Sequence, residues 1–230
     1  MGKTIIVAGF GPGISAAVAE KFGAEGYAVA LVARKAERLA VGAKALQAKG
    51  IKAASFVADL GDPQAVTAMV AKVRQELGPV GVLHWNAYGN GAGDLLKASP
   101  ADLHAVLDVA VTGLLSAVQA ALPDLRAAKG AVLVTNGGLA LIDPQIDARA
   151  VTWGVSGLAV ANAAKQKVVG ILSEQLKPDG IYVGQVMVLG TIRGTPFDQG
   201  NANLEGSAVA DKFWELYQAR TTVYASAAGS

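Results

Sequence analysis

The sequence contains no cysteine, and this absence excludes disulfide bonds, thiolate metal sites and a cysteine nucleophile. Charged residues are also few (17%), and the formal net charge of +2 gives no electrostatic basis for binding nucleic acid. Only two histidines are present, so we expect no metal site.

Long hydrophobic runs are missing as well. The longest uncharged helical stretch, residues 109–122, is shorter than the ~20 apolar residues that a bilayer-spanning helix needs. Met1 leads directly into a strand-like apolar run, without the features of a signal or transit peptide. The sequence therefore predicts no membrane partner and a cytoplasmic location.

Apolar strand-like runs alternate with helical patterns along the chain. Its 230 residues, of which 52% are hydrophobic, fit one domain over residues 1–230 with a large core. Strands that are apolar on both faces and alternate with helices indicate a parallel sheet covered on both sides. The expected strands are 4–8, 28–33, 53–58, 80–85, 131–135 and 181–188, and the expected helices lie near 13–25, 35–49, 63–77, 100–128, 155–176 and 207–219. We predict a single Rossmann-type, doubly wound α/β domain, with loops at 86–93 and 190–203 and a frayed tail at 225–230.

Three glycines follow the first expected strand. Gly9, Gly11 and Gly13 separate a β-branched run from an alanine-rich helical pattern. In that context glycines allow a tight turn and the close approach of a pyrophosphate, which the amides at the helix N-terminus then face. The spacing departs from G-x-G-x-x-G, because Ile14 stands at the third glycine position. A plain strand–helix turn is the alternative, and the surrounding pattern favours a dinucleotide site.

The second expected strand ends without an acidic residue. Arg34 and Lys35 follow it, about 20 residues beyond the glycines, where an Asp or Glu binds the ribose 2′-hydroxyl of NAD. A guanidinium can instead hold a 2′-phosphate through charge-assisted hydrogen bonds. The alternative is that both are solvated residues at a helix start, although cations there oppose the helix dipole. We therefore predict NADP rather than NAD.

Two further landmarks complete a family resemblance. Asp59 follows the third strand, and Asn86-Ala87-Tyr88 follows the fourth. Together with the glycine loop, these motifs resemble the short-chain dehydrogenase/reductase superfamily, whose pattern is T-G-x-x-x-G-I-G, an Asp that contacts adenine, and N-N-A-G. The chain departs from that pattern with Ser15 for the last glycine, Trp85 for the first Asn and Tyr88 for the last Gly. The resemblance covers nearly the whole chain.

The resemblance implies a set of cofactor-binding positions. They are Gly9, Gly11, Gly13, Ile14, Arg34, Lys35, Asp59, Leu60, Asn86, Ala87, Asn162, Gly190 and Ile192. Asp59 has an alternative role as a turn residue that caps the next helix. His84 lies inside a strand, so we expect a hydrogen-bonded core histidine rather than a ligand or base.

The proton relay of the family is missing from this sequence. In typical members a Tyr donates a proton, a Lys four residues later lowers the pKa of that Tyr, and a Ser and an Asn assist. None of the five tyrosines is followed by Lys at that spacing. The resemblance places Gly137 at the Ser position and Ala110 at the Asn position. The usual relay therefore cannot form.

Two alignments remain open for the Tyr and Lys positions. One places Trp153 and Gly157 there, and the other places Leu158 and Asn162 there. We prefer the second, because it keeps apolar residues on the buried stripe of the helix without an insertion. In that alignment Asn162 can still hydrogen-bond to the nicotinamide ribose, but it carries no charge.

Two functions of different classes fit this combination. The first is an NADPH-dependent reductase with another proton source, acting on an activated small molecule such as an enone, imine or quinone. Tyr88 is its candidate catalytic residue, because it replaces a glycine beside the nicotinamide ribose in the family pattern; packing as a lid is the alternative role. The second function is a catalytically inactive NADP-binding sensor or assembly subunit. We favour the reductase.

The helices expected at 100–128 and 155–176 carry apolar residues around much of their circumference. The first contains Val106, Leu107, Val109, Val111, Leu114, Leu115, Val118 and Leu122. A helix that covers a sheet needs only one apolar stripe. The corresponding helices of the family pair across two-fold axes, so we predict a homodimer or homotetramer.

Overall fold

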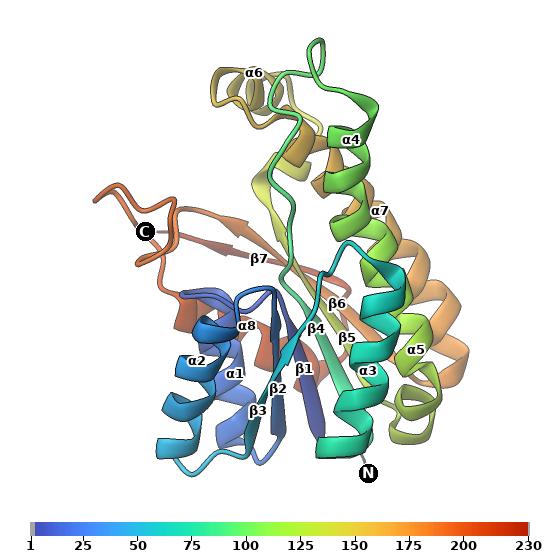
Figure 1. Ribbon diagram of the computed structural model, residues 1–230. Helices are drawn as coiled ribbons and strands as arrows, with labels where there is room; N and C mark the ends of the chain where they lie inside the picture. Colours follow the sequence, from blue (N-terminus) through green and yellow to red (C-terminus); the bar gives the residue numbers. More distant parts are fainter. Residues whose placement is uncertain (1–2, 230) are drawn as a thin grey trace.

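A seven-stranded parallel sheet forms the centre of the structure, a computed structural model that describes residues 3–229 (Figure 1). Its strands are β1 (Thr4–Ala8), β2 (Ala28–Ala33), β3 (Ala53–Val57), β4 (Val80–Trp85), β5 (Ala131–Gly137), β6 (Tyr182–Leu189) and β7 (Tyr224–Ala228). They lie in the order β3-β2-β1-β4-β5-β6-β7. The winding reverses between β1 and β4, where ligands of such sheets bind at the carboxyl ends of the strands. The predicted doubly wound fold is confirmed.

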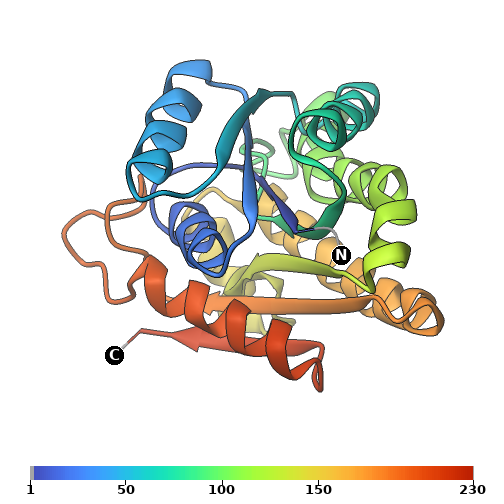
Figure 2. The same ribbon diagram turned by 90° about the horizontal axis from the view of Figure 1, so that it is seen from below.

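Helices cover both faces of the sheet (Figures 1 and 2). One face carries α1 (Ile14–Ala24), α2 (Ala36–Ala48) and α8 (Gly206–Ala219), and the other carries α3 (Pro63–Leu77), α5 (Gly113–Ala128) and α7 (Ser156–Leu176). The shorter elements are α4 (Pro100–Leu107), η1 (Asp108–Thr112), η2 (Gly138–Ala140), α6 (Pro144–Thr152) and η3 (Lys177–Asp179). Ile5 and Ile6 of β1 point to opposite cores. This two-sided burial explains the unbroken apolar runs.

Three helices begin at the same local signal, a polar cap followed by proline. The side chains of Asp62, Ser99 and Asp143 each accept a hydrogen bond from a backbone amide in the first turn of α3, α4 and α6. The first two helices were predicted from this signal. The third was missed because α6 is short, with nine residues, and buries only Ala150.

The C-terminal segment corrects one prediction. Residues 225–228 belong to β7, which pairs in parallel with β6, with Ala225 opposite Val186. The amide of Gln185 donates to the carbonyl of Val223 at 2.7 Å. The prediction of a frayed tail was wrong for these residues. Their small side chains have low β-propensity, and it is the pairing with β6 that orders them as a strand. Ser230 lies outside the described residues. Met1 and Gly2, where the sequence predicted no signal or transit peptide, lie outside them as well.

α4, η1 and α5 form one continuous helix, Pro100–Ala128. This helix is long and apolar enough to cross a membrane by length and composition, which the prediction from residues 109–122 overlooked. That is weak evidence, because buried core helices pass the same test, and 39% of its most apolar window is buried. Val106, Leu114 and Val118 lie in the core. The outer face is therefore less apolar than we predicted.

His84 is a core residue, as predicted. Its side chain is fully buried in β4, with Nε2 3.1 Å from the hydroxyl of Thr135 and the ring 4.9 Å from that of Phe213. Nδ1 has no hydrogen-bond partner within the described part of the chain. Burial lowers the pKa of His84 to about 3, so the imidazole is neutral at physiological pH.

This burial predicts an acid-dependent loss of stability. Because the unfolded chain binds a proton at His84 near pH 6.5 and the folded chain does not, the free energy of unfolding should fall as pH falls below 6.5. We expect a loss of about 2 kcal/mol between pH 7.5 and pH 5 from this group. Urea unfolding at one protein concentration across this range should show a shallower decline for His84→Gln. The matched variant His104→Gln, altered at an exposed position, should show the same dependence of the free energy of unfolding on pH as the wild type. If His84→Gln also shows the wild-type dependence, His84 is not the group that causes the loss of stability.

Candidate functional site

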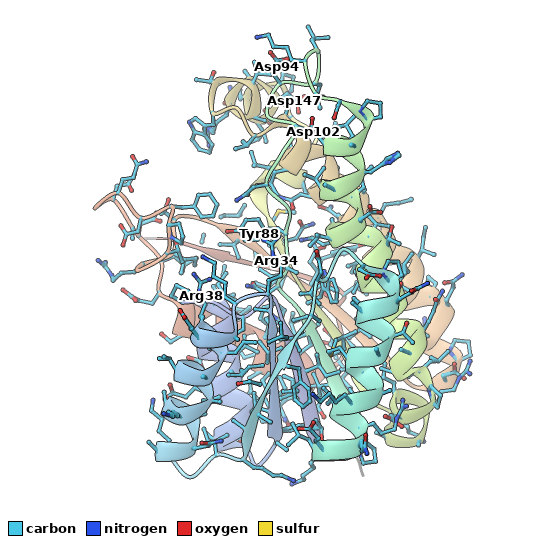
Figure 3. All side chains as sticks on the ribbon, viewed as in Figure 1. Arg34, Arg38, Tyr88, Asp94, Asp102 and Asp147 are labelled. Carbon is cyan, nitrogen blue, oxygen red and sulfur yellow. The ribbon has the colours of Figure 1, made fainter. Side chains whose placement is uncertain are left out.

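Loops gather at the carboxyl ends of the strands, where the winding reverses between β1 and β4. Figure 3 shows Arg34, Arg38 and Tyr88 close to this edge. The acidic side chains Asp94 and Asp102 lie further out; Asp94 pairs with a neighbouring lysine, and Asp102 completes the cap of α4. The candidate site is therefore cationic and aromatic at its outer side.

The glycine loop is the point at which three loops meet. Gly9 and Gly13 have φ angles of +84° and +87°, which disfavour any other residue. A Cβ on Gly9 would lie 2.6 Å from the backbone nitrogen of Ala87, and one on Gly13 would lie 2.8 Å from Cγ2 of Thr195. A Cβ on Gly11 would meet only Nη1 of Arg38, at 3.6 Å. Gly9 and Gly13 are therefore required by packing, whereas a Cβ on Gly11 would make only an ordinary van der Waals contact with the Arg38 side chain.

The N-terminus of α1 is suited to an anion. No side chain caps it, and its first turn contains no acidic residue. Ser15, which replaces the last glycine of the family pattern, holds the loop instead: its hydroxyl accepts from the amide of Gly11 at 2.9 Å and donates to the carbonyl of Gly11 at 3.0 Å. The remaining first-turn amides can receive a phosphate group. This uncapped terminus beside Gly11 fits a dinucleotide.

Three cations lie beside the glycine loop. Arg34 and Lys35 connect β2 to α2, and Arg38 lies in the first turn of α2; all three are exposed. Among residues 3–229, no carboxylate forms an ion pair with any of them. Sequence reasoning missed Arg38, although its place four residues after Arg34 could have indicated it. These side chains can hold a 2′-phosphate.

Asn86 and Ala87 hold the glycine loop against β4. The amide of Asn86 donates to the carbonyl of Ala8 at 2.9 Å, and its side chain donates to the carbonyl of Gly9 at 3.4 Å. Ala87 is buried against Gly9. On the other side, the amides of Gly9 and Phe10 donate to the carbonyl of Val32, at 3.0 and 2.9 Å. The loop is therefore fixed before any ligand binds.

Asp59 and Leu60 lie at the end of β3. The carboxylate of Asp59 accepts from the amide of Gly61 at 3.0 Å. Asp59 is therefore a turn residue, but the residue that caps α3 is Asp62 and not Asp59. The carboxylate of Asp59 is exposed and has acceptor capacity left for a ligand. The side chain of Leu60 is buried, and its carbonyl contacts Gly113 of α5. Leu60 can therefore offer a ligand only its backbone.

The loop after β6 folds over the N-terminus of α1. Ile192 is buried, and its Cγ2 lies 2.9 Å from the Cβ position of Gly13. Asn203 ties down the start of the loop, since its Oδ1 accepts from the amide of Thr191 at 3.0 Å. A Cβ on Gly190 would lie 2.7 Å from the same oxygen. The structure thus places Gly190 and Ile192 in the loop that packs over the N-terminus of α1.

Buried amides form the floor of the site. The side chain of Asn136 donates to the carbonyl of Asn162 at 3.0 Å and to Oε1 of Gln185 at 3.2 Å, and it accepts from the amide of Gly137 at 3.1 Å. A Cβ on Gly137 would lie 3.1 Å from Nδ2 of Asn162. The expected Ser and Lys positions therefore lie side by side when Asn162 takes the Lys position.

The alignment that uses Trp153 and Gly157 places the Tyr and Lys positions in different surroundings. Trp153 is exposed in the turn between α6 and α7, where its ring stacks with Arg149. Gly157 lies against the loop before α4, and its amide donates to the carbonyl of Ala92 at 2.8 Å. The geometry favours the alignment that uses Leu158 and Asn162.

Tyr88 lies half-exposed at the rim. Its ring centroid is 6.0 Å from that of Phe197, which belongs to the loop after β6. Partial burial raises the pKa of Tyr88, and the charge of Arg38 opposes this shift. The hydroxyl is therefore protonated at neutral pH and can donate a hydrogen bond, but nothing here activates it as an acid.

Sequence reasoning also missed Lys165 on α7. Its side chain is only 3% exposed, and burial lowers the pKa of its amine to about 8. It lies three residues beyond Asn162 on the same face of the helix. The signal that could have found it is a lysine within the apolar stripe of an amphipathic helix.

Comparisons with known proteins agree with this geometry. The 3-dehydrosphinganine reductase TSC10B of Arabidopsis thaliana is 30% identical over 188 residues, covering 79% of this chain and 53% of that protein. This chain therefore spans about half the length of that relative. A blue fluorescent protein from a metagenomic library, in complex with NADPH, superposes with a TM-score of 0.81 at 26% identity, covering 99% of this chain and 97% of that one.

A second solved structure is an NADPH-bound short-chain oxidoreductase of Pseudomonas aeruginosa PAO1 that contains an atypical catalytic center. Its TM-score is 0.85 at 20% identity, covering 99% of this chain and 96% of that one. The family profile of short chain dehydrogenases matches residues 3–201. The chain belongs to the short-chain dehydrogenase family.

Proposed function

We propose that this protein is a cytoplasmic NADP(H)-dependent oxidoreductase that works without the usual Tyr–Lys proton relay. One observation carries the proposal: the nucleotide-binding half of the site is built, while the relay positions are replaced. The uncapped N-terminus of α1 faces Gly11, and beside it Gly137 and Asn162 stand where the family has Ser and Lys. The same fold holds an atypical center in the Pseudomonas aeruginosa oxidoreductase, which supports such a replacement.

The cationic rim supports NADP as the cofactor. Arg34, Lys35 and Arg38 lie where an NAD-binding protein carries a carboxylate, and a guanidinium matches the geometry of a phosphate group. Both solved structures compared above contain NADPH, one of them at 26% identity. In the proposed site, Asp59 and the backbone of Leu60 face the adenine, and Asn86, Ala87, Asn162, Gly190 and Ile192 surround the nicotinamide half.

The bound cofactor would supply or accept a hydride. The residues around it must hold the substrate and leave the proton to another source, because Asn162 has no charge and the pKa of Tyr88 is raised. Tyr88 can donate a hydrogen bond to the substrate from the rim. An enone, imine or quinone can take its proton from water, so we propose an activated small molecule of this kind as the substrate.

Apolar side chains are exposed beyond the carboxyl edge of the sheet. The segments around α6 and before α4 rise above the sheet edge (Figure 1). They expose Leu96, Ile142 and Trp153, with 99% of Ile142 accessible.

A second candidate function is a catalytically inactive NADP-binding sensor or assembly subunit. The replaced relay positions favour it, because a protein that only binds the cofactor has no need of them. NADPH consumption across a panel of ketones, enones, imines and quinones separates the two functions. Cofactor binding without turnover of any member would support the sensor.

The cation at the end of β2 predicts the cofactor preference. Arg34→Ala should weaken NADP binding by about 1.5–3 kcal/mol, because a charge-assisted contact to the 2′-phosphate is lost. NAD binding should change little. Calorimetric titration of both cofactors measures this, with Lys44→Ala on the exposed face of α2 as the matched control. Tighter binding of NAD than NADP by the wild type, or an unchanged NADP affinity in Arg34→Ala, would overturn the preference.

The missing relay predicts weak activity on ordinary substrates. We expect oxidation of simple secondary alcohols and reduction of simple ketones far below about 10 per second, a typical enzyme median, because the sequence has no Tyr with a Lys four residues later. At least one enone, imine or quinone should consume NADPH faster. Turnover of a secondary alcohol near that median rate would refute this expectation.

We also propose a homodimer or homotetramer that uses the outer face of α7 together with α4 and α5. Val160 and Ile171 on α7 are 42% and 48% exposed. Charges introduced there by Val160→Asp and Ile171→Asp should separate the assembly, because a buried unpaired charge is unfavourable. Light scattering should give a multiple of the 23.3 kDa chain mass for the wild type. Val41→Asp on α2 is the matched control; a monomeric wild type, or an assembled double variant, would contradict the proposal.

A further inference from the structure

Lys165 is a buried amine in the middle of the apolar face of α7. Its neighbours on that face are Ala161, Asn162 and Val169, all buried. A lysine is almost never fully buried without a partner, because burial disfavours its charged form. Yet in residues 3–229 no carboxylate or hydrogen-bond acceptor contacts its amine.

The direction of the helix places the amine toward the candidate site. Side chains on an α-helix lean toward its N-terminus and cover the preceding turn. The side chain of Lys165 therefore extends toward the turn that contains Ala161 and Asn162. Because α7 follows β5 and runs back along the sheet, this turn lies nearer than Lys165 to the strands' carboxyl ends, beside Gly137.

Small residues surround that turn. Ala161 packs against Val106 and Ala110, and Ala110 lies in η1, a π-helical turn of the kind often found at functional sites. On the opposite side Gly137 has no side chain. The side chain of Asn162 forms no hydrogen bond within the described chain, although the residue is only 5% exposed. Two largely buried polar residues, Asn162 and Lys165, thus lie one helical turn apart. Within residues 3–229 neither side chain forms a hydrogen bond, and their polar atoms are not among the side-chain atoms closed off from solvent.

The elements packed against α7 carry few ionisable groups. Those groups are Asp102 and His104 of α4, Asp108 of η1, Asp147 and Arg149 of α6, Tyr182 of β6, and Lys177 and Asp179 of η3; β5 and η2 have none. Asp108 binds Thr112 and faces Gly61, and the hydroxyl of Tyr182 donates to the carbonyl of Thr222. No described group therefore neutralises the amine.

We propose that Lys165 is a positioning residue of the cofactor site, whose ammonium orients the side chain of Asn162 when the dinucleotide binds. The ammonium donates to Oδ1 of Asn162, which turns Nδ2 toward the ribose of the cofactor. Lysine and asparagine three residues apart on a helix can meet in this way. This inference rests on the proposed function, because it requires a dinucleotide beside Asn162.

The inference has a measurable consequence in proton uptake. The free protein holds the amine partly neutral above pH 8, since burial lowers the pKa of Lys165 to about 8. A bound cofactor that recruits the ammonium raises this pKa, so binding takes up protons between pH 8 and 9. NADP affinity should then be constant below pH 8 and fall above it, by up to about tenfold per pH unit.

Calorimetric titration of NADP in two buffers of different ionisation enthalpy, at pH 7 and pH 8.5, measures this uptake. The wild type should take up a fraction of a proton at pH 8.5 and none from this group at pH 7. Lys165→Met, with similar length and no charge, should abolish the uptake, and so should Asn162→Ala. Lys167→Met, which removes an exposed lysine of the same helix, should leave it unchanged.

The outcomes separate this inference from the proposed function. NADP binding by the wild type without proton uptake, or uptake retained in Lys165→Met, overturns the role of Lys165 and leaves the proposed function standing. The absence of NADP binding by the wild type overturns both. If Lys165→Met fails to fold, the wild-type titration still decides, because absence of uptake at pH 8.5 contradicts the role.

Discussion

The close approach of the β4 loop to Gly9 is the constraint on which the site depends. The backbone nitrogen of Ala87 occupies the space that a Cβ on Gly9 would need, and the carbonyl of Val32 binds the next two amides of the loop. These contacts join the ends of β1, β2 and β4 into one rigid edge. That edge fixes the positions of the N-terminus of α1, the cations beside α2 and Tyr88, because each lies within a few residues of a strand end.

The site separates its charges from its polar neutral groups. The arginines stand exposed at the outer rim, where water keeps the free energy of isolated charges low. The floor contains the amides of Asn136, Asn162 and Gln185, and Asn136 satisfies its buried amide through three hydrogen bonds. Such a floor can orient a ligand but cannot move a proton by itself. The fold and the chemistry that we propose for the site therefore have separate physical origins.

Local patterns predicted the part of the fold that local physics determines. β1 to β6, the glycine loop and the capped helices carry their signals within a few residues, so sequence reasoning found them. β7 depends instead on pairing with the edge of β6, and its small side chains carry little signal. α6 begins with the same cap and proline as α3, yet it is shorter and buries only one residue. For both elements the missing information was tertiary.

The site shows the same division between local and tertiary information. The glycines and Arg34 could be assigned from the sequence, because their roles depend on a single turn. Arg38 and Lys165 could not be assigned in this way. Arg38 lies near Gly11 only because α2 packs close to the glycine loop, and Lys165 is buried only because of how α7 packs. A lysine on the buried stripe of a helix lowers stability unless something else compensates for it. In the proposed complex the compensating group is Oδ1 of Asn162, and the bound cofactor holds that side chain in the orientation in which its oxygen meets the ammonium.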